Sequence, residues 1–194
     1  MNPAQLVLAS QSPRRKQLLE QIGVQFIVAP ANVPEVYSAT ETPLEYVQRL
    51  ALEKASFIAQ QYDDSVAVLG ADTIGVCDGR VLEKPTSLAD AKSMLLAMSG
   101  RDHEVISAVA VVWGETKLVN TSTTLVTFRS ISESEIEAYW RTGEPQDRSG
   151  SYAIQGYGGV FVEKIVGSYS NVVGLPIEIL VPMFKEIGVP IWLR

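Results

Sequence analysis

The stretch spanning residues 66–85 constrains the fold of this chain more than any other segment. An apolar run at 66–69 predicts a buried strand, which we expect to end near Gly70. Asp78-Gly79 is typical of a two-residue hairpin turn, and residues 75–82 supply its two short arms. The stretch therefore predicts a strand that leads directly into a hairpin.

Two polar residues, Asp72 and Thr73, follow the apolar run at once. A carboxylate and a hydroxyl at the end of an apolar strand lie where α/β sheets usually place their chemistry. The returning arm of the hairpin is expected to bring Lys84 back toward the Asp72 end of the strand. The alternative is that Asp72 only caps a turn and that Lys84 is solvated, because Asp and Lys are common at surfaces.

Strand and helix patterns alternate along the chain, which favours an α/β fold. Further strands are predicted at 6–9, 24–29, 103–113, 116–128 and 161–165. Helices are predicted at 13–22, 43–62, 88–97, 133–142 and 177–187, with a polar turn at 167–171. A length of 194 residues suits one large domain or two tightly joined lobes, and we expect a single domain over residues 1–194.

The overall charge and the cysteine content restrict the partners and the compartment. A net charge of -6 argues against non-specific binding to nucleic acid or to an anionic membrane. Cys77 is the only cysteine, which excludes an internal disulfide and favours a reducing compartment, so a cytoplasmic location is expected. Residues 1–9 show no signal-peptide pattern, and no apolar run approaches the ~18 residues of a membrane span.

His103 is the only histidine, which excludes a zinc site built from several histidines. It stands at the entrance of an apolar run, where a structural role is expected. Hydrolytic chemistry in this chain is therefore expected to use carboxylates, lysines and a hard divalent metal.

The helix that begins after Ser12 carries three cations in its first turn: Arg14, Arg15 and Lys16. The helix dipole favours negative charge there, so each cation is unfavourable by about 0.3–1 kcal/mol. An anion bound by the free N–H groups, by Ser10 or Ser12 and by the arginines would relieve the conflict. The alternative is a solvated basic turn.

Lys54 shares the apolar face of its predicted helix with Ala51 and Ile58. A lysine on an inward face must either extend its ammonium to water or meet an anion. Glu35 is the only acid of the loop 30–35; it is a candidate metal ligand, and the alternative is a solvated side chain.

Residues 150–159 contain four glycines, which indicates that the backbone closely approaches a flat or charged group. Gln155 lies in this segment and offers an amide that could contact the edge of a base; the alternative is a buried Gln in a glycine-rich loop. No phosphate-binding P-loop pattern occurs anywhere in the chain.

Several segments together resemble the Maf family of nucleotide pyrophosphatases. They are residues 8–15, 49–55, 70–73, 83–85, 152–156 and 171–176. The resemblance implies a mixed sheet flanked by helices, with two lobes around a cleft, as in the inosine-triphosphatase-like enzymes. It also implies hydrolysis of a nucleoside triphosphate between the α- and β-phosphates, and the Asp72-Thr73 pair resembles the branch that acts on dTTP and UTP.

The resemblance further implies a set of site residues. Asp72 corresponds to the proton acceptor, Lys54 and Lys84 to active-site lysines, and Arg14, Thr73 and Gln155 to specificity positions. Ser10 and Arg15 are expected to contact the substrate, and Glu35 and Asp72 to hold a divalent cation, Mg²⁺, Mn²⁺ or Co²⁺. Family members often carry an acid-rich loop before this Glu, whereas this chain has Asn32-Val33-Pro34.

Two other functions fit the same resemblance: a nucleotide-binding regulator of cell division without turnover, and the branch specific for 7-methyl-GTP. The expected partner is a nucleotide, with no nucleic acid and no membrane. Tyr139 and Trp140 could form a homodimer face, although core packing is the more common use of such residues.

Overall fold

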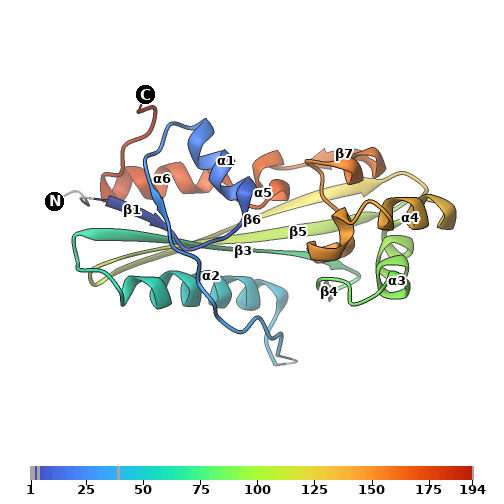
Figure 1. The fold of residues 1–194 in the computed structure, drawn as a ribbon, viewed down its shortest axis with the longest axis horizontal. Helices are drawn as coiled ribbons and strands as arrows, with labels where there is room; N and C mark the ends of the chain where they lie inside the picture. Colours follow the sequence, from blue (N-terminus) through green and yellow to red (C-terminus); the bar gives the residue numbers. More distant parts are fainter. Residues whose placement is uncertain (1–2, 4, 39, 194) are drawn as a thin grey trace. The chain divides into compact units, whose positions relative to one another are not determined.

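The computed structural model describes residues 3, 5–38 and 40–193, and it has a mixed α/β fold built on one seven-stranded sheet (Figure 1). The strand order is β2-β1-β3-β5-β6-β7, and β4 pairs with β3 outside this path. Strand β1 runs parallel to β2 and β3, whereas β3–β4 and β6–β7 are antiparallel. The predicted class, a mixed sheet flanked by helices, is confirmed.

The strands of the described chain are β1 (Gln5–Leu8), β2 (Ile27–Val28), β3 (Val66–Cys77), β4 (Arg80–Leu82), β5 (Asp102–Trp113), β6 (Thr116–Phe128) and β7 (Val162–Val166). The α-helices are α1 (Pro13–Gln21), α2 (Pro43–Ala59), α3 (Leu88–Met98), α4 (Glu133–Trp140), α5 (Tyr169–Val173) and α6 (Ile177–Ile187). Three short 3₁₀ turns are η1 (Glu144–Asp147), η2 (Ser149–Ser151) and η3 (Tyr157–Phe161). No helix among the described residues has the length and apolar character needed to cross a membrane.

The chain divides into two compact units. Unit 1 comprises the described residues of Met1–Asp72, Ser107–Ser122 and Gly174–Arg194, and unit 2 comprises Thr73–Ile106 and Thr123–Val173. Strands β3, β5 and β6 contribute residues to both, and the division of β3 falls between Asp72 and Thr73. The expectation that residues 1–194 form a single domain stays a prediction. The cleft between two lobes that the family resemblance implies also stays a prediction.

Unit 1 packs helices on both faces of its part of the sheet, with α2 on one face and α1 and α6 on the other (Figure 1). Helix α2 begins with a capping box, in which Thr42 and Glu45 bind each other's backbone N–H groups. Its buried stripe includes Leu50 and Ala51, as the helical spacing predicted. This packing fixes how α2 meets the sheet.

Unit 2 has its own core, in which α3 packs against α4 and aromatic rings fill the interior. His103 is buried at its centre, with its Nε2 2.8 Å from the Tyr152 hydroxyl and its ring edge-on to Phe128. Burial lowers the pKa of His103 to about 4, so the ring is neutral at pH 7. The predicted structural role of His103 is confirmed.

Three predictions about elements were wrong. Strand β3 does not end near Gly70 but continues to Cys77, and Gly70 is instead the position at which the α2 backbone lies directly on the strand. The predicted strand at 24–29 is only Ile27–Val28, and the predicted polar turn contains the short helix α5. The hairpin turn is confirmed: Asp78 and Gly79 have φ values of 51° and 74°, as a two-residue turn requires.

Candidate active site

Lys54 joins two carboxylates in unit 1. Its Nζ lies 2.7 Å from Asp72 Oδ1 and 2.5 Å from Glu35 Oε1. Lys54 and Asp72 are each only 7% exposed, whereas the Glu35 side chain is 43% exposed. The Lys54 ammonium therefore contacts two carboxylates instead of extending to water. Asp72, which was predicted to lie in a charged site, is bound directly by this ammonium.

Gly70 explains how Lys54 and Asp72 come together. A Cβ atom at Gly70 would lie 2.2 Å from the Ala51 carbonyl oxygen and 2.7 Å from the Ala55 nitrogen, so the α2 backbone rests on β3 at this point. Asp72 is two residues further along the strand and faces the same side of the sheet. It therefore points toward α2, where Lys54 lies between the two alanines in sequence. The sequence pattern indicated a strand end at Gly70 and did not predict its contact with α2.

Arg15 turns back from the first turn of α1 toward the end of β1. Its Nε donates to the Gly174 carbonyl at 2.8 Å, and its Nη1 donates to Ser10 Oγ at 3.1 Å. Ser10 Oγ also accepts the Ser12 N–H at 3.2 Å. Arg15 and Ser10 are thus brought together as predicted, and Gly174 is an additional partner from the predicted motif at 171–176.

The other two cations of this helix turn are placed differently. Lys16 forms an exposed ion pair with Glu20, one helical turn away, at 3.7 Å. Its positive charge is therefore paired with a carboxylate at the surface. Arg14 is half-buried at the start of α1. Binding of an anion at this helix end stays a prediction, carried by Arg14, Arg15 and Ser10.

The charges of unit 1 act on one another. Burial raises the pKa of Asp72, and the nearby Lys54 and Arg15 oppose this increase while Glu35 adds to it. Burial also lowers the pKa of Arg15, while Asp72 and Glu35 raise it. Because a carboxylate with a raised pKa is a better proton acceptor than an exposed one, Asp72 is suited to general-base catalysis.

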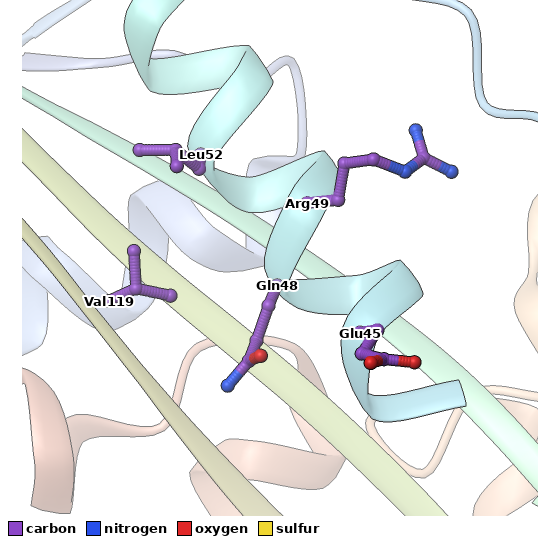
Figure 2. A pocket seen from close by; sticks show the side chains of 5 residues that line it. All are labelled: Glu45, Gln48, Arg49, Leu52 and Val119. Atoms are coloured by element: carbon purple, nitrogen blue, oxygen red, sulfur yellow. The ribbon is translucent and has the colours of Figure 1, made fainter. Parts of the chain in front are cut away.

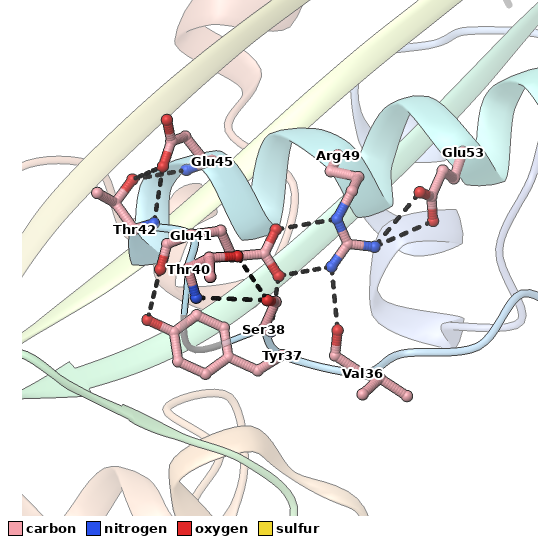
Figure 3. A network of polar contacts seen from close by, with 9 residues as sticks. All are labelled: Val36, Tyr37, Ser38, Thr40, Glu41, Thr42, Glu45, Arg49 and Glu53. Atoms are coloured by element: carbon pink, nitrogen blue, oxygen red, sulfur yellow. Dashed lines mark hydrogen bonds and ion pairs between the residues drawn. The ribbon is translucent and has the colours of Figure 1, made fainter.

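The segment that carries Glu35 is held by Arg49 of α2 (Figure 3). Arg49 Nη2 donates to the Val36 carbonyl at 3.0 Å, directly after Glu35 in sequence. The same guanidinium binds both carboxylate oxygens of Glu41, at 2.6 and 2.9 Å, and a third pair links it to Glu53 at 3.3 Å. Arg49 belongs to the predicted motif at 49–55, but its contacts with the loop could not be derived from spacing.

Glu35 and Asp72 are the candidate metal ligands. Among the residues that the structure describes, no group of three or more His, Cys, Asp or Glu side chains is arranged to hold a metal ion. Two carboxylates that share one cationic partner nevertheless fit Mg²⁺, which is commonly bound by one or two carboxylates together with substrate phosphates and water. The donor set therefore fits a divalent cation that completes its coordination with water or with an anionic ligand.

The remaining predicted site residues, Lys84, Thr73 and Gln155, belong to unit 2. The register of the hairpin, with Gly75 opposite Leu82, leads the chain back along β3 toward Thr73. The approach of Lys84 to Asp72 stays a prediction. Lys84 Nζ is 3.0 Å from Asp147 Oδ1 on an exposed surface. Thr73 is half-buried, and Gln155 is exposed, so the alternative of a buried Gln155 was wrong.

A shallow hollow of about 310 Å³ lies elsewhere in unit 1 (Figure 2). It is lined by Glu45, Gln48, Arg49, Leu52 and Val119. The helical residues project from the face of α2 opposite Lys54, as their spacing in the helix requires. The hollow is therefore separate from the cluster around Lys54, and it lacks a buried ionisable group.

Comparison with known proteins adds independent information. Residues 5–187 match the family described as Maf-like protein. The chain is 49% identical to a "dTTP/UTP pyrophosphatase" of Saccharophagus degradans, over 98% of this chain and 92% of that protein. It is 51% identical to a "dTTP/UTP pyrophosphatase" of Aliivibrio fischeri, over 90% of this chain and 93% of that protein.

A solved structure of a nucleoside-triphosphatase (dITP/XTP pyrophosphatase) from Mycobacterium abscessus covers 94% of this chain and 97% of its own, with 17% identity. Its TM-score of 0.45 is too low to support an argument about the site. The family match and the two sequence relatives confirm the resemblance seen in the motifs. The chain belongs to the Maf-like protein family.

Proposed function

We propose that this chain is a nucleoside triphosphate pyrophosphatase that hydrolyses dTTP and UTP to the monophosphate and pyrophosphate. The observation that carries the proposal is the buried Asp72 carboxylate, which is bound by Lys54. Lys54 also binds Glu35, and the charges of Arg15 and Glu35 act on the Asp72 carboxylate. The sequence relatives named for dTTP and UTP hydrolysis support this choice of substrate over 7-methyl-GTP.

In this proposal, Asp72 is the proton acceptor. A water molecule attacks phosphorus at the anhydride between the α- and β-phosphates, and Asp72 takes one proton from that water. The anhydride bond breaks, and the nucleoside monophosphate and pyrophosphate are released. Lys54 holds the Asp72 carboxylate at 2.7 Å, which orients it and favours its ionised form. Since phosphoryl-type transfer depends mainly on positioning and electrostatics, these fixed charges supply most of the catalysis.

Arg14, Arg15 and Ser10 are proposed to bind phosphate oxygens at the start of α1. Arg15 is already directed by Ser10 and by the Gly174 carbonyl, so less side-chain freedom is lost when substrate binds. Glu35 and Asp72 would hold Mg²⁺, Mn²⁺ or Co²⁺, which when bound neutralises phosphate charge and acidifies water. Lys84 is proposed as a further active-site lysine, and Thr73 and Gln155 are proposed as specificity residues, with Gln155 contacting the base.

We also propose that the enzyme is cytoplasmic, because a single cysteine suits a reducing compartment. A homodimer stays a prediction. Tyr139 is buried in the core of unit 2 and half-buried Trp140 ends α4, which supports core packing as the use of Tyr139.

A substrate panel tests the proposed activity. The protein is incubated with Mg²⁺ or Mn²⁺ and with each of dTTP, UTP, CTP, GTP and 7-methyl-GTP, and released pyrophosphate is measured. We expect release from dTTP and UTP. Turnover of 7-methyl-GTP alone would place the chain in that branch, and nucleotide binding without turnover would favour a regulator.

A further inference from the structure

The glycine-rich loop of unit 2 surrounds a carboxylate of its own chain. Glu144 Oε2 accepts the Tyr157 N–H at 3.0 Å, and Glu144 Oε1 accepts the Gly158 N–H at 2.9 Å. Oε1 also accepts the Tyr139 hydroxyl at 2.6 Å. The charged group that the glycines allow the backbone to approach is therefore Glu144.

The same tyrosine holds the other end of the loop. The Tyr139 hydroxyl accepts the Ala153 N–H at 3.2 Å while it donates to Glu144. Tyr139 is itself fixed in the core, where its ring packs edge-on against Phe161 at 5.1 Å. The backbone is thus anchored at Ala153 and again at Tyr157-Gly158.

Two glycines are required for this arrangement. A Cβ atom at Gly156 would lie 2.2 Å from Glu144 Oε2, and one at Gly158 would lie 2.5 Å from the Tyr139 hydroxyl. No side chain can be accommodated at such distances without moving the carboxylate or the hydroxyl. The composition of the loop is therefore explained by the Tyr139–Glu144 pair.

Glu144 is suited to hold backbone amides. Burial raises its pKa, but the hydrogen bonds from Tyr139, Gly158 and Tyr157 outweigh this effect, and the pKa is lowered overall. The carboxylate is therefore ionised at neutral pH and acts only as an acceptor. Hydrogen bonds to a charged acceptor are stronger than those between neutral groups.

We propose that Tyr139 and Glu144 are positioning residues that hold the segment 153–158 so that the exposed Gln155 is presented to the base of the nucleotide. This inference rests on the proposed function. The Gln155 amide has a donor and an acceptor side by side, which matches the N3–H and O4 of thymine and uracil. Cytosine carries an amino donor in place of O4. A loosely held Gln155 could turn its amide to suit either pattern, so it would distinguish thymine or uracil from cytosine less well.

The test compares Tyr139→Phe and Glu144→Gln with the unmodified protein. Each variant removes part of the anchor while nearly keeping the side-chain volume. The matched control is Tyr152→Phe, which removes a buried hydroxyl directly before the anchored segment 153–158; that hydroxyl is bonded to His103 and makes no contact with Glu144. The values of kcat and KM are measured for dTTP and dCTP, and the exchange of the Tyr157 and Gly158 amide protons is followed by NMR.

We expect both anchor variants to raise KM for dTTP about tenfold, equivalent to about 1.4 kcal/mol, with kcat changed by less than about threefold. The dTTP preference over dCTP falls by a similar factor, amide exchange at Tyr157 and Gly158 accelerates, and Tyr152→Phe changes none of these.

An unchanged preference together with unchanged exchange would overturn the positioning role, even if thermal stability fell. If a variant fails to fold, the milder Glu144→Asp, which shortens the side chain but keeps its charge, is measured in the same way. Absence of turnover by the unmodified protein would instead refute the proposed function itself.

Discussion

Two carboxylates in this molecule are held in contrasting ways. Asp72 in unit 1 is bound by the ammonium of Lys54 and lies in the field of Arg15. Glu144 in unit 2 is bound by two backbone N–H groups and by a tyrosine hydroxyl.

The pKa values follow the environments in opposite directions. Burial dominates at Asp72 and raises its pKa, whereas hydrogen bonds dominate at Glu144 and lower its pKa. A raised pKa suits a group that must take a proton, and a lowered pKa suits one that must stay ionised and hold other groups. Asp72 in unit 1 is therefore suited to proton transfer, and Glu144 in unit 2 is suited to holding the backbone in place.

The largest effect is expected at Asp72. Replacing Asp72 by Ala or Asn removes the proton acceptor, and pyrophosphate release from dTTP should fall at least about 10²-fold, as for loss of a general base. The measurement is the steady-state kcat with dTTP. Asp64→Asn, which changes an exposed aspartate of the same unit, is the control and should leave kcat unchanged. Activity retained within a factor of two by Asp72→Asn would contradict the assignment of Asp72.

A smaller effect is expected at Lys54. Lys54→Met keeps much of the side-chain volume but removes the charge that orients Asp72, so kcat should fall about ten- to a hundredfold, somewhat less than for loss of a preorganised donor at a reacting oxygen. Lys16→Met, which changes an exposed lysine paired with Glu20, should behave like the unmodified protein. Equal kcat values for the two variants would show that Lys54 is not part of the reaction.

The smallest effect concerns Gly70. Gly70→Ala places a Cβ 2.2 Å from the Ala51 carbonyl oxygen, so α2 must shift away from β3. We expect the free energy of unfolding to fall by about 1–3 kcal/mol, as for other overpacked sites, and this is measured by urea denaturation. Gly75→Ala in the same strand is the control, because the nearest atoms to its Cβ are 3.7 Å away. Similar stabilities of the two variants would argue against a tight contact at Gly70.

The sequence predicted local features well because they depend on near neighbours. The inward direction of Lys54 follows from helical spacing, and the Asp78-Gly79 turn follows from residue type. The association of Arg15 with Ser10 also lies within a few residues.

Other features depended on contacts between distant segments. The close contact between α2 and Gly70 joins a helix and a strand that are separate in sequence. Neither the sequence of the helix nor that of the strand specifies this contact by itself. The glycine-rich loop was expected to approach a flat or charged group, and only the folded chain shows that Glu144 is that group. The hydrogen bond from Arg49 to the Val36 carbonyl, next to Glu35, likewise could not be predicted from local sequence, because the two residues are 13 positions apart. Sequence patterns identified the chemical groups but not these supports.

The proposed role of Asp72 is tested most directly by its pKa, measured by NMR titration of the ¹³C-labelled carboxyl group in the unmodified protein and in Lys54→Met. We expect the pKa of Asp72 to lie above the usual 3.8 in the unmodified protein, because burial raises it, and to be still higher in the variant, because an opposing positive charge is lost. Activity should then be lost on the acid side at a higher pH in Lys54→Met. A pKa at or below 3.8, or one that does not change when Lys54 is replaced, would contradict this role.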